Sequence, residues 1–226
     1  GDQSGGQWTV LSSTNVAPSA RRFYEMASLG PGKVVLFGGY NGGQHLGDTW
    51  LFDLSNKEWA SIGNSLSATA PSARKDFAMT SLGAGKVMLF GGFDGTNQYL
   101  NDTWVFDDQS NKGWTLIGIP TNTKAPSSRA SHAMALLREG IVVLFGGWDG
   151  SQELNDTWIF YQSTKTWATL TTQAPPPRDS HAMASLGTGK VVLFGGFDGS
   201  QLLGDTWVFN QSTTGWALIE ASTNTK

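Results

Sequence analysis

A short apolar run that ends in two glycines occurs four times in this sequence, and each copy is followed by Asp-Thr-Trp. The copies span residues 34–39, 87–92, 142–147 and 191–196, so they begin 53, 55 and 49 residues apart. Self-similarity at such a period is typical of proteins built from stacked structural units, because one unit of this size cannot bury its own apolar face. We therefore expect the 226 residues to form one continuous repeat domain rather than two independent domains.

The repeat divides nearly the whole chain into units of similar length. Within a single domain of residues 1–226, four full units are predicted at 17–69, 70–124, 125–173 and 174–226. Residues 1–16 match only the last part of a unit, since Asp2–Trp8 resembles Asp108–Trp114. The sequence also stops where another Ala-Pro joint would open a further unit. These features favour a segment of a longer array, with a closed ring of four units or a ring made by two chains as the alternatives.

Each unit predicts four short strands and no helix. In the first unit a strand at 23–29 ends in a tight glycine turn. The apolar run follows as a second strand, and its continuous β-branched character indicates that other structure covers both of its faces. The third strand begins at Asp-Thr-Trp and alternates with period 2, and a turn leads to the fourth strand at 59–62. Repeated sets of four antiparallel strands predict the blades of a β-propeller, an all-β fold.

Tryptophan occupies two further columns of the repeat. One column holds Trp8, Trp59, Trp114, Trp167 and Trp216, and the other holds Trp50, Trp104, Trp158 and Trp207. Together with the Gly-Gly doublet and the unit length, these columns make all four units resemble kelch repeats. The resemblance implies a kelch-type β-propeller of four complete four-stranded blades, with residues 1–16 as an extra N-terminal outer strand of an incomplete blade. It also implies that the first strand of each blade lines a central channel. The loops before that strand and after Gly-Gly would then form one binding face.

Composition excludes several classes of function. The net charge of −3 provides no basic surface for DNA or RNA. No apolar run approaches the roughly 20 residues that span a membrane, and no targeting segment is visible. Without cysteine the chain cannot form disulfides, thiolate nucleophiles or cysteine-based zinc sites. Because the sequence also offers no nucleophile beside a base, no metal-ligand set and no cofactor loop, we expect neither enzymatic activity nor a cofactor.

Four of the six arginines occupy one column, three residues after a proline. These are Arg21, Arg74, Arg129 and Arg178. The kelch resemblance places them at the channel mouth, where a ring of guanidinium groups would bind a carboxylate, a phosphate or an acidic peptide. The favoured alternative is that each arginine pairs with the Asp of its own Asp-Thr-Trp segment and stabilises its blade.

The residue after Gly-Gly is always aromatic but differs between units: Tyr40, Phe93, Trp148 and Phe197. Solvent-facing aromatic side chains would form a contact surface for peptides or sugars, and packing within the fold is the equally weighted alternative. The Asn-Gly or Asp-Gly that follows indicates a turn, which accounts for the polar residue there.

His132 and His181 share a column with Tyr24 and Phe77 of the other units. Two histidines in an aromatic slot favour packing or channel lining over a metal site, and both are retained as candidate ligand-binding residues.

The sequence favours a non-catalytic binding scaffold for a protein or peptide, acidic segments included. A carbohydrate ligand and self-association through an incomplete ring stay open, whereas nucleic acid and membrane partners are not expected. One alternative is part of a galactose-oxidase-like enzyme, although the copper site implied by that resemblance needs a Tyr cross-linked to Cys, which this chain lacks. The other alternative is a structural spacer.

Overall fold

The computed structural model describes residues 16–62, 70–109, 113–118, 120 and 123–220. Four four-stranded antiparallel sheets, which we call blades 1 to 4, follow one another along the chain. Blade 1 contains β1 (Glu25–Gly30), β2 (Lys33–Tyr40), β3 (His45–Asp53) and β4 (Glu58–Ile62). Blade 2 contains β6 (Ala78–Gly83), β7 (Lys86–Phe90), β9 (Thr103–Asp107) and β10 (Gly113–Leu116). Blade 3 contains β11 (Ala133–Arg138), β12 (Ile141–Phe145), β13 (Thr157–Tyr161) and β14 (Thr166–Leu170). Blade 4 contains β15 (Ala182–Gly187), β16 (Lys190–Phe194), β17 (Thr206–Asn210) and β18 (Gly215–Glu220).

The apolar run before Gly-Gly forms the second strand of every blade, as predicted. In β7 each of the residues Val87–Phe90 is fully buried, because this strand has a sheet neighbour on each side and another blade against each face. Its register pairs Leu89 with Trp104, and Trp104 in turn pairs with Leu116 on the outer strand. Successive side chains on a strand point to opposite faces, so each blade presents apolar residues to both of its neighbours.

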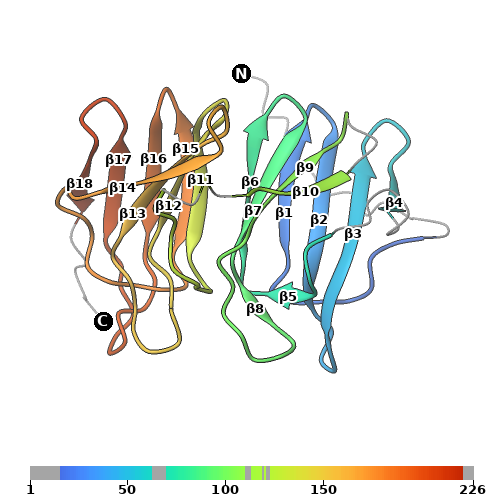
Figure 1. Cartoon of the computed structure of the whole chain (residues 1–226), viewed down its shortest axis with the longest axis horizontal. Coiled ribbons are helices and arrows are strands. Elements are labelled where there is room, and N and C mark those ends of the chain that lie inside the picture. Colours follow the sequence, from blue (N-terminus) through green and yellow to red (C-terminus); the bar gives the residue numbers. More distant parts are fainter. Residues whose placement is uncertain (1–15, 63–69, 110–112, 119, 121–122, 221–226) are drawn as a thin grey trace, which may run out of the picture.

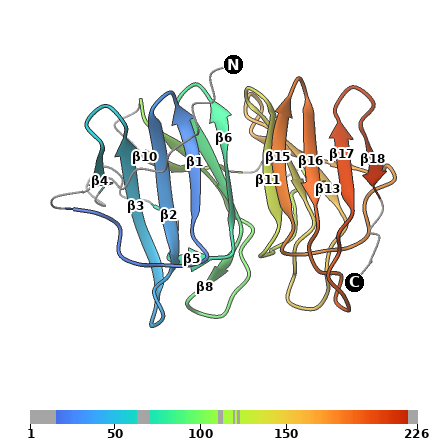
Figure 2. The same ribbon diagram turned by 180° about the vertical axis from the view of Figure 1, so that it is seen from behind.

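The blades stand side by side with their first strands at the centre (Figures 1 and 2). The row of first strands runs β1, β6, β11, β15, and each is in contact with the next. Three apolar cores fill the junctions between blades 1 and 2, 2 and 3, and 3 and 4. No helix occurs in the part of the chain that the structure describes. The all-β kelch propeller predicted from the sequence is therefore confirmed, whereas the extra N-terminal strand falls on residues outside the described ones.

A short two-stranded sheet marks one end of the blades. β5 (Arg74–Lys75) pairs with β8 (Phe93–Asp94), so the residue after the column arginine, Lys75, lies opposite the aromatic residue after Gly-Gly, Phe93. Isolated bridges make the same connection in the other blades, between Arg22 and Tyr40, between Ala130 and Trp148, and between Asp179 and Phe197. The loops before the first strand and after Gly-Gly therefore lie together at this end, which we call the loop face (Figure 1).

Candidate binding face

Each column arginine is held inside its own blade by the aspartate of Asp-Thr-Trp. In blade 3, Arg129 donates to both carboxylate oxygens of Asp156 at 2.6 and 2.7 Å and to the Gly146 carbonyl at 3.0 Å. Its remaining N–H groups donate to the backbone carbonyl and to the hydroxyl of Ser127. The indole of Trp158 donates to the same carboxylate at 2.6 Å. One arginine thus connects the segment before the first strand with the end of the second strand and the start of the third.

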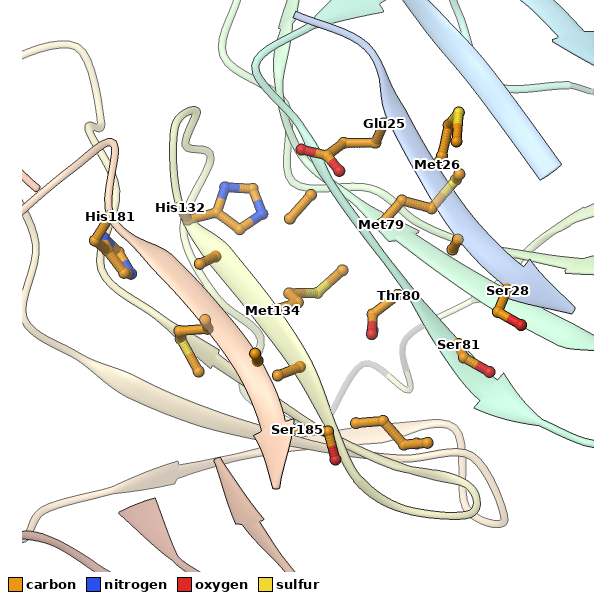
Figure 3. Close-up of a pocket in the computed structure, with 17 residues that line it drawn as sticks. Glu25, Met26, Ser28, Met79, Thr80, Ser81, His132, Met134, His181 and Ser185 are labelled. Carbon is orange, nitrogen blue, oxygen red and sulfur yellow. The ribbon is translucent and has the colours of Figure 1, made fainter. Parts of the chain in front are cut away.

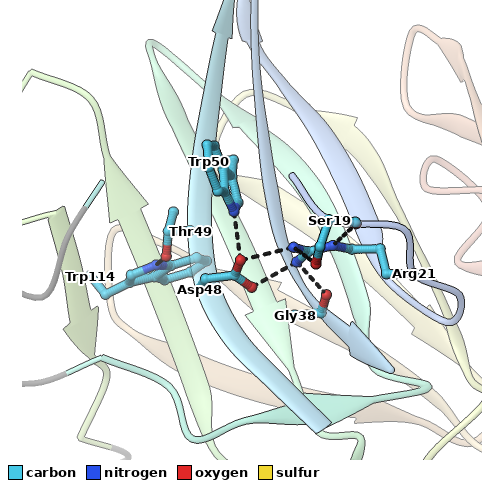
Figure 4. A network of polar contacts seen from close by, with 7 residues as sticks. All are labelled: Ser19, Arg21, Gly38, Asp48, Thr49, Trp50 and Trp114. Atoms are coloured by element: carbon cyan, nitrogen blue, oxygen red, sulfur yellow. Dashed lines mark hydrogen bonds and ion pairs between the residues drawn. The ribbon is translucent and has the colours of Figure 1, made fainter. Parts of the chain in front are cut away.

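The Arg–Asp–Trp network recurs in all four blades, although in blade 4 Pro176 replaces the serine and offers only its backbone carbonyl. Figure 4 shows it in blade 1, where Arg21 contacts Asp48, Gly38 and Ser19. The corresponding ion pairs are Arg74–Asp102, Arg129–Asp156 and Arg178–Asp205, each with N–O distances of 2.6 Å. The arginine side chains are 0–3 % exposed. The pairing that the alternative interpretation predicted is therefore present, and it occupies the donors of these side chains within the blade. A role of Arg21, Arg74, Arg129 and Arg178 in ligand binding stays a prediction, and the binding surface proposed below is built without them.

The two candidate histidines fill packing positions. The rings of His132 and His181 meet Phe90 and Phe145 edge-on at centroid distances of 5.5 and 5.6 Å, as Phe77 meets Phe37 at 5.7 Å. Burial, followed by the charge of Arg178, lowers the pKa of His181 to about 3. Burial, followed by Arg129, lowers the pKa of His132 well below its ordinary value. Both rings are therefore neutral near neutral pH, and both also line the cavity between the first strands that is described below. A role of His132 and His181 in ligand binding stays a prediction.

A chain of backbone hydrogen bonds connects the blades across the loop face. Asp76 N–H donates to the Phe23 carbonyl, Ser131 N–H to that of Asp76, and Ser180 N–H to that of Ser131, at 3.4, 2.7 and 2.8 Å. All four residues adopt positive φ, between 53° and 58°. This conformation is unusual for residues other than glycine, asparagine and aspartate, and a bulky aromatic at positive φ is rare. The same backbone conformation therefore recurs at residues of different type, of which Phe23 and Ser180 are exposed and Asp76 and Ser131 are half-buried.

A cluster of cations and aromatic rings lies at this position in blades 1 and 2. The Arg22 guanidinium carbon is 4.9 Å from the ring centroid of Phe23 and 5.6 Å from that of Tyr40. The Lys75 amine is 5.3 Å from Phe23, 6.0 Å from Tyr40 and 5.6 Å from Phe93. Phe23 is 46 % exposed. Cations at such distances from ring faces are attracted to them, and we call these five residues the cation–aromatic cluster.

The aromatic residues after Gly-Gly are all partly open to solvent. Tyr40, Phe93 and Trp148 are half-buried, and Phe197 is 36 % exposed. Tyr40 and Phe93 belong to the cation–aromatic cluster, whereas Trp148 and Phe197 follow in blades 3 and 4. The structure thus places all four on the loop face but brings only the first two together with cations.

The acidic residues next to these aromatics serve as turn formers. Asp149 accepts hydrogen bonds from the Ser151 hydroxyl and from the N–H groups of Ser151 and Gln152, at 2.7, 2.8 and 3.0 Å. Asp198 accepts the equivalent bonds, led by the Ser200 hydroxyl, and these lower its pKa to about 2. The turn interpretation made from Asp-Gly accounts for these carboxylates.

A cavity of about 480 Å³ opens between the first strands of the four blades (Figure 3). Its lining is mostly small or apolar, with methionines from every blade, and Glu25 is its acidic group. Burial raises the pKa of Glu25 to about 7. The other blades carry alanine at this position, namely Ala78, Ala133 and Ala182. Sequence reasoning missed Glu25, and also Arg22, Phe23 and Lys75, because it concentrated on columns shared by all blades.

Comparison with known proteins gives the family. Residues 64–226 match a family model described as "KLHDC2/KLHL20/DRC7 Kelch-repeats domain", and residues 27–65 match one described as "Kelch motif". The first match alone covers more than half of the sequence. The chain therefore belongs to the kelch-repeat family, whose repeats generally serve as protein-interaction modules and are typically non-catalytic.

Relatives carry similar segments within much longer proteins. The chain is 26 % identical over 173 residues to the "Dynein alpha chain, flagellar outer arm" of Chlamydomonas reinhardtii, covering 73 % of this chain and 4 % of that protein. It is 32 % identical over 148 residues to the human "Multiple epidermal growth factor-like domains protein 8", covering 65 % and 5 %. It is 32 % identical over 135 residues to the "F-box/kelch-repeat protein At1g51550" of Arabidopsis thaliana, covering 56 % and 28 %. The chain thus spans 28 % or less of these relatives.

The described residues contain neither a metal-ligand cluster nor a membrane-spanning helix. No group of three or more His, Asp or Glu side chains there could hold a metal ion. No helix within the same residues is long and apolar enough to cross a membrane.

Proposed function

We propose that the chain is a non-catalytic scaffold whose loop face binds an acidic segment of a partner protein. The observation that carries this proposal is the cation–aromatic cluster. Arg22 is exposed and makes no ion pair with any described residue, in contrast to the four column arginines. An exposed guanidinium over aromatic faces offers both charge-assisted hydrogen bonds for a carboxylate and apolar area for the neighbouring side chains.

Charge is distributed unevenly over the loop face, which supports binding in one orientation. The position after the column arginine holds Arg22 in blade 1 and Lys75 in blade 2, but Ala130 and Asp179 in blades 3 and 4. Lys75 is 3.5 Å from Asp76, which offsets part of its charge, so Arg22 is the stronger anchor. An acidic peptide would lie with its carboxylates over blades 1 and 2 and would be repelled by Asp179 on the other side.

The proposal is tested with a short fluorescent peptide rich in Glu and a matched peptide with Lys in place of each Glu. We expect fluorescence anisotropy to show binding of the acidic peptide alone, with an affinity that falls as salt is added. The double variant Arg22→Ala/Lys75→Ala should weaken binding about tenfold or more, which corresponds to about 1.4 kcal/mol. Arg138→Ala is the control, because Arg138 is exposed and is the last residue of β11, whose end lies opposite the loop face.

A second variant separates the aromatic contribution from the charge. Phe23→Ser installs the residue found at the equivalent positions Ser131 and Ser180 and relieves a bulky side chain at positive φ. It should weaken peptide binding without lowering the melting temperature. Equal binding of both peptides, or an equal loss in Arg138→Ala, would rule out the acidic-segment proposal. Competition by a neutral oligosaccharide would instead indicate a carbohydrate ligand stacked on the aromatic rings.

A further inference from the structure

The row of first strands carries an acidic side chain, Glu25, at the start of β1. The other blades have alanine at the equivalent position, and the sheet register confirms the equivalence. Glu25, Ala78, Ala133 and Ala182 each pair with the phenylalanine that precedes Gly-Gly on the second strand. Three blades therefore form this part of the sheet with a methyl group, so the fold does not require a carboxyl group here.

The Glu25 carboxyl group has no partner among the described residues, in contrast to the paired carboxylates of the Asp-Thr-Trp segments. Glu25 lies on the face of β1 that also carries Ala27 and Leu29, and these two are buried in the core between blades 1 and 2. Glu25 itself is half-buried, and burial raises its pKa to about 7. A half-buried carboxyl group without a hydrogen-bond donor is unfavourable, and a bound donor would remove this cost.

Two buried imidazole rings also lack hydrogen bonds. His132 and His181 are 5 % and 8 % exposed, and neither nitrogen of either ring makes a hydrogen bond with a described residue. The backbone carbonyls of Phe90 and Phe145 favour a proton on these rings but lie outside hydrogen-bonding geometry. Because both rings are neutral, each keeps one acceptor nitrogen. Phe77 fills the same slot in blade 2, so packing alone does not require that nitrogen.

These three polar groups face one cavity. The cavity of about 480 Å³ between the first strands is lined by Glu25, His132 and His181 together with alanines and methionines. In Figure 3 the Glu25 carboxyl group and the His132 ring extend toward each other, and His181 follows at the start of β15. Glu25 lies at the junction of blades 1 and 2, His132 at that of blades 2 and 3, and His181 at that of blades 3 and 4. The surroundings of each group therefore come from two blades that the structure describes.

We propose that this cavity binds a small organic cation, a primary ammonium group that carries a short apolar chain. An ammonium group has three N–H donors and no acceptor, which matches the carboxylate and the two imidazole nitrogens in number. The ionised carboxylate attracts the cation, and the hydrogen bonds between them are charge-assisted. Met79, Met134 and Met183 provide adaptable apolar contacts for the chain. The site uses neither Arg22 nor Phe23, so it is independent of the peptide binding proposed above.

Titration with n-butylamine tests the proposal, and n-butanol is the matched neutral probe. The amine is protonated at pH 8, because primary amines titrate at about pH 10. The NMR signals of the methionine methyl groups report the place of binding, since four of the five methionines line the cavity and Met88 lies in the core behind it. We expect saturable shifts of the four lining methionines with a dissociation constant on the order of 1 mM, and binding of n-butanol about tenfold weaker or less.

Two substitutions remove the acceptors one at a time. Glu25→Gln keeps the shape of the side chain but removes its charge, and it should weaken binding of the amine about tenfold or more. His132→Phe installs the residue type found at Phe77, and it should weaken binding about threefold without lowering the melting temperature. Glu58→Gln is the matched control, because Glu58 is exposed on the outer strand of the same blade and should leave the affinity unchanged.

The dependence of binding on pH gives a second readout. The cation binds the ionised form of Glu25, and for a pKa of about 7 the ionised fraction rises about tenfold from pH 6 to pH 8. The affinity for the amine should therefore rise about tenfold over this range. The other titratable groups of the lining, His132 and His181, stay neutral there, and the nearby Arg129 and Arg178 keep their charge. Glu25→Gln should bind the amine equally at both pH values.

Equal affinity for the two probes, or an unchanged affinity in Glu25→Gln, would overturn the proposal. The absence of saturable shifts, or shifts of Met88 as large as those of the lining methionines, would overturn it as well. Circular dichroism should show that every variant keeps its strands. Glu25→Ala, which installs the residue of the other three blades, replaces Glu25→Gln if the latter does not fold.

Discussion

Replacing Arg129 by alanine tests whether the Arg–Asp network stabilises a blade or serves a ligand. The side chain is fully buried and donates five hydrogen bonds, to Asp156, Gly146 and Ser127. Its removal leaves the Asp156 carboxylate with the indole of Trp158 as its side-chain donor. The carbonyl of Gly146 loses its side-chain partner as well, so the variant contains buried and partly buried acceptors that have each lost a donor.

The expected loss follows from the exposure of the remaining partner. Removing one member of a buried ion pair costs about 3–5 kcal/mol. The Asp156 side chain is 33 % exposed, so water recovers part of the lost interaction. We therefore expect the free energy of unfolding to fall by about 3 kcal/mol, the lower end of that range. At about 2–4 °C per kcal/mol for a domain of this size, the melting temperature should fall by roughly 6–12 °C.

Urea unfolding followed by tryptophan fluorescence measures this loss, and two further variants define its origin. Arg22→Ala removes the same side chain from an exposed position and should cost less than about 0.5 kcal/mol. In the double variant Arg129→Ala/Asp156→Ala the losses should be clearly less than additive, because the two residues act as one unit. A loss of less than about 1 kcal/mol in Arg129→Ala would refute a stabilising role for the network.

Two further predictions concern backbone approach and pH. Gly146 has φ 63°, and a Cβ there would lie 2.6 Å from the Arg178 carbonyl oxygen, whereas Gly187 has φ 73° and open space around it. Gly187→Ala should lower the free energy of unfolding in urea by about 1–2 kcal/mol, because alanine is disfavoured at a left-handed backbone angle. Gly146→Ala should lower it clearly more, because the added Cβ also meets the carbonyl oxygen. Equal losses in the two variants would contradict this. The pKa of His181 is lowered from 6.5 to about 3, so between these pH values the ring binds a proton in the unfolded chain but not in the folded one. Its contribution to stability is therefore full above pH 6.5 and is lost as the pH falls toward 3. When the pH is lowered from roughly 7 to 5, the free energy of unfolding should fall by about 2 kcal/mol less in His181→Phe than in the unaltered chain. Identical pH profiles of the two proteins would be inconsistent with a buried neutral ring.

The blades could be predicted from the sequence because periodic features determine them. A continuous apolar run, a Gly-Gly doublet and an alternating Asp-Thr-Trp segment each specify a local conformation, and their repetition specifies the stacking. The role of the arginine column could not be decided in the same way. Both hypotheses, a ring of ligand-binding guanidinium groups and a set of Arg–Asp pairs, require arginine at the same position of every repeat. The sequence therefore does not separate them, whereas the structure shows the partners 2.6–2.7 Å apart.

The cation–aromatic cluster escaped prediction because it depends on conformation and on neighbours in different blades. Nothing in the residues around Phe23 indicates a φ of 58°, and the backbone hydrogen bond that Phe23 accepts comes from a residue of the next blade. The contact between Lys75 and Phe23 joins positions 52 residues apart that belong to adjacent blades. The raised pKa of Glu25 has a similar origin, because its burial is produced by first strands that are distant in sequence.

The fold places residues of different type next to the column arginines, and the binding face that we propose lies at these positions. Across the loop face the blades are connected through the N–H and C=O groups of Phe23, Asp76, Ser131 and Ser180, so the hydrogen bonds persist whatever side chain each position carries. A substitution at these positions changes the charge and apolar area of the face without disturbing the junctions beneath it. The column arginines and aspartates cannot vary in this way, because each of them completes a network inside its blade. Differences between blades at these positions therefore alter the surface of the loop face with the least change in the fold.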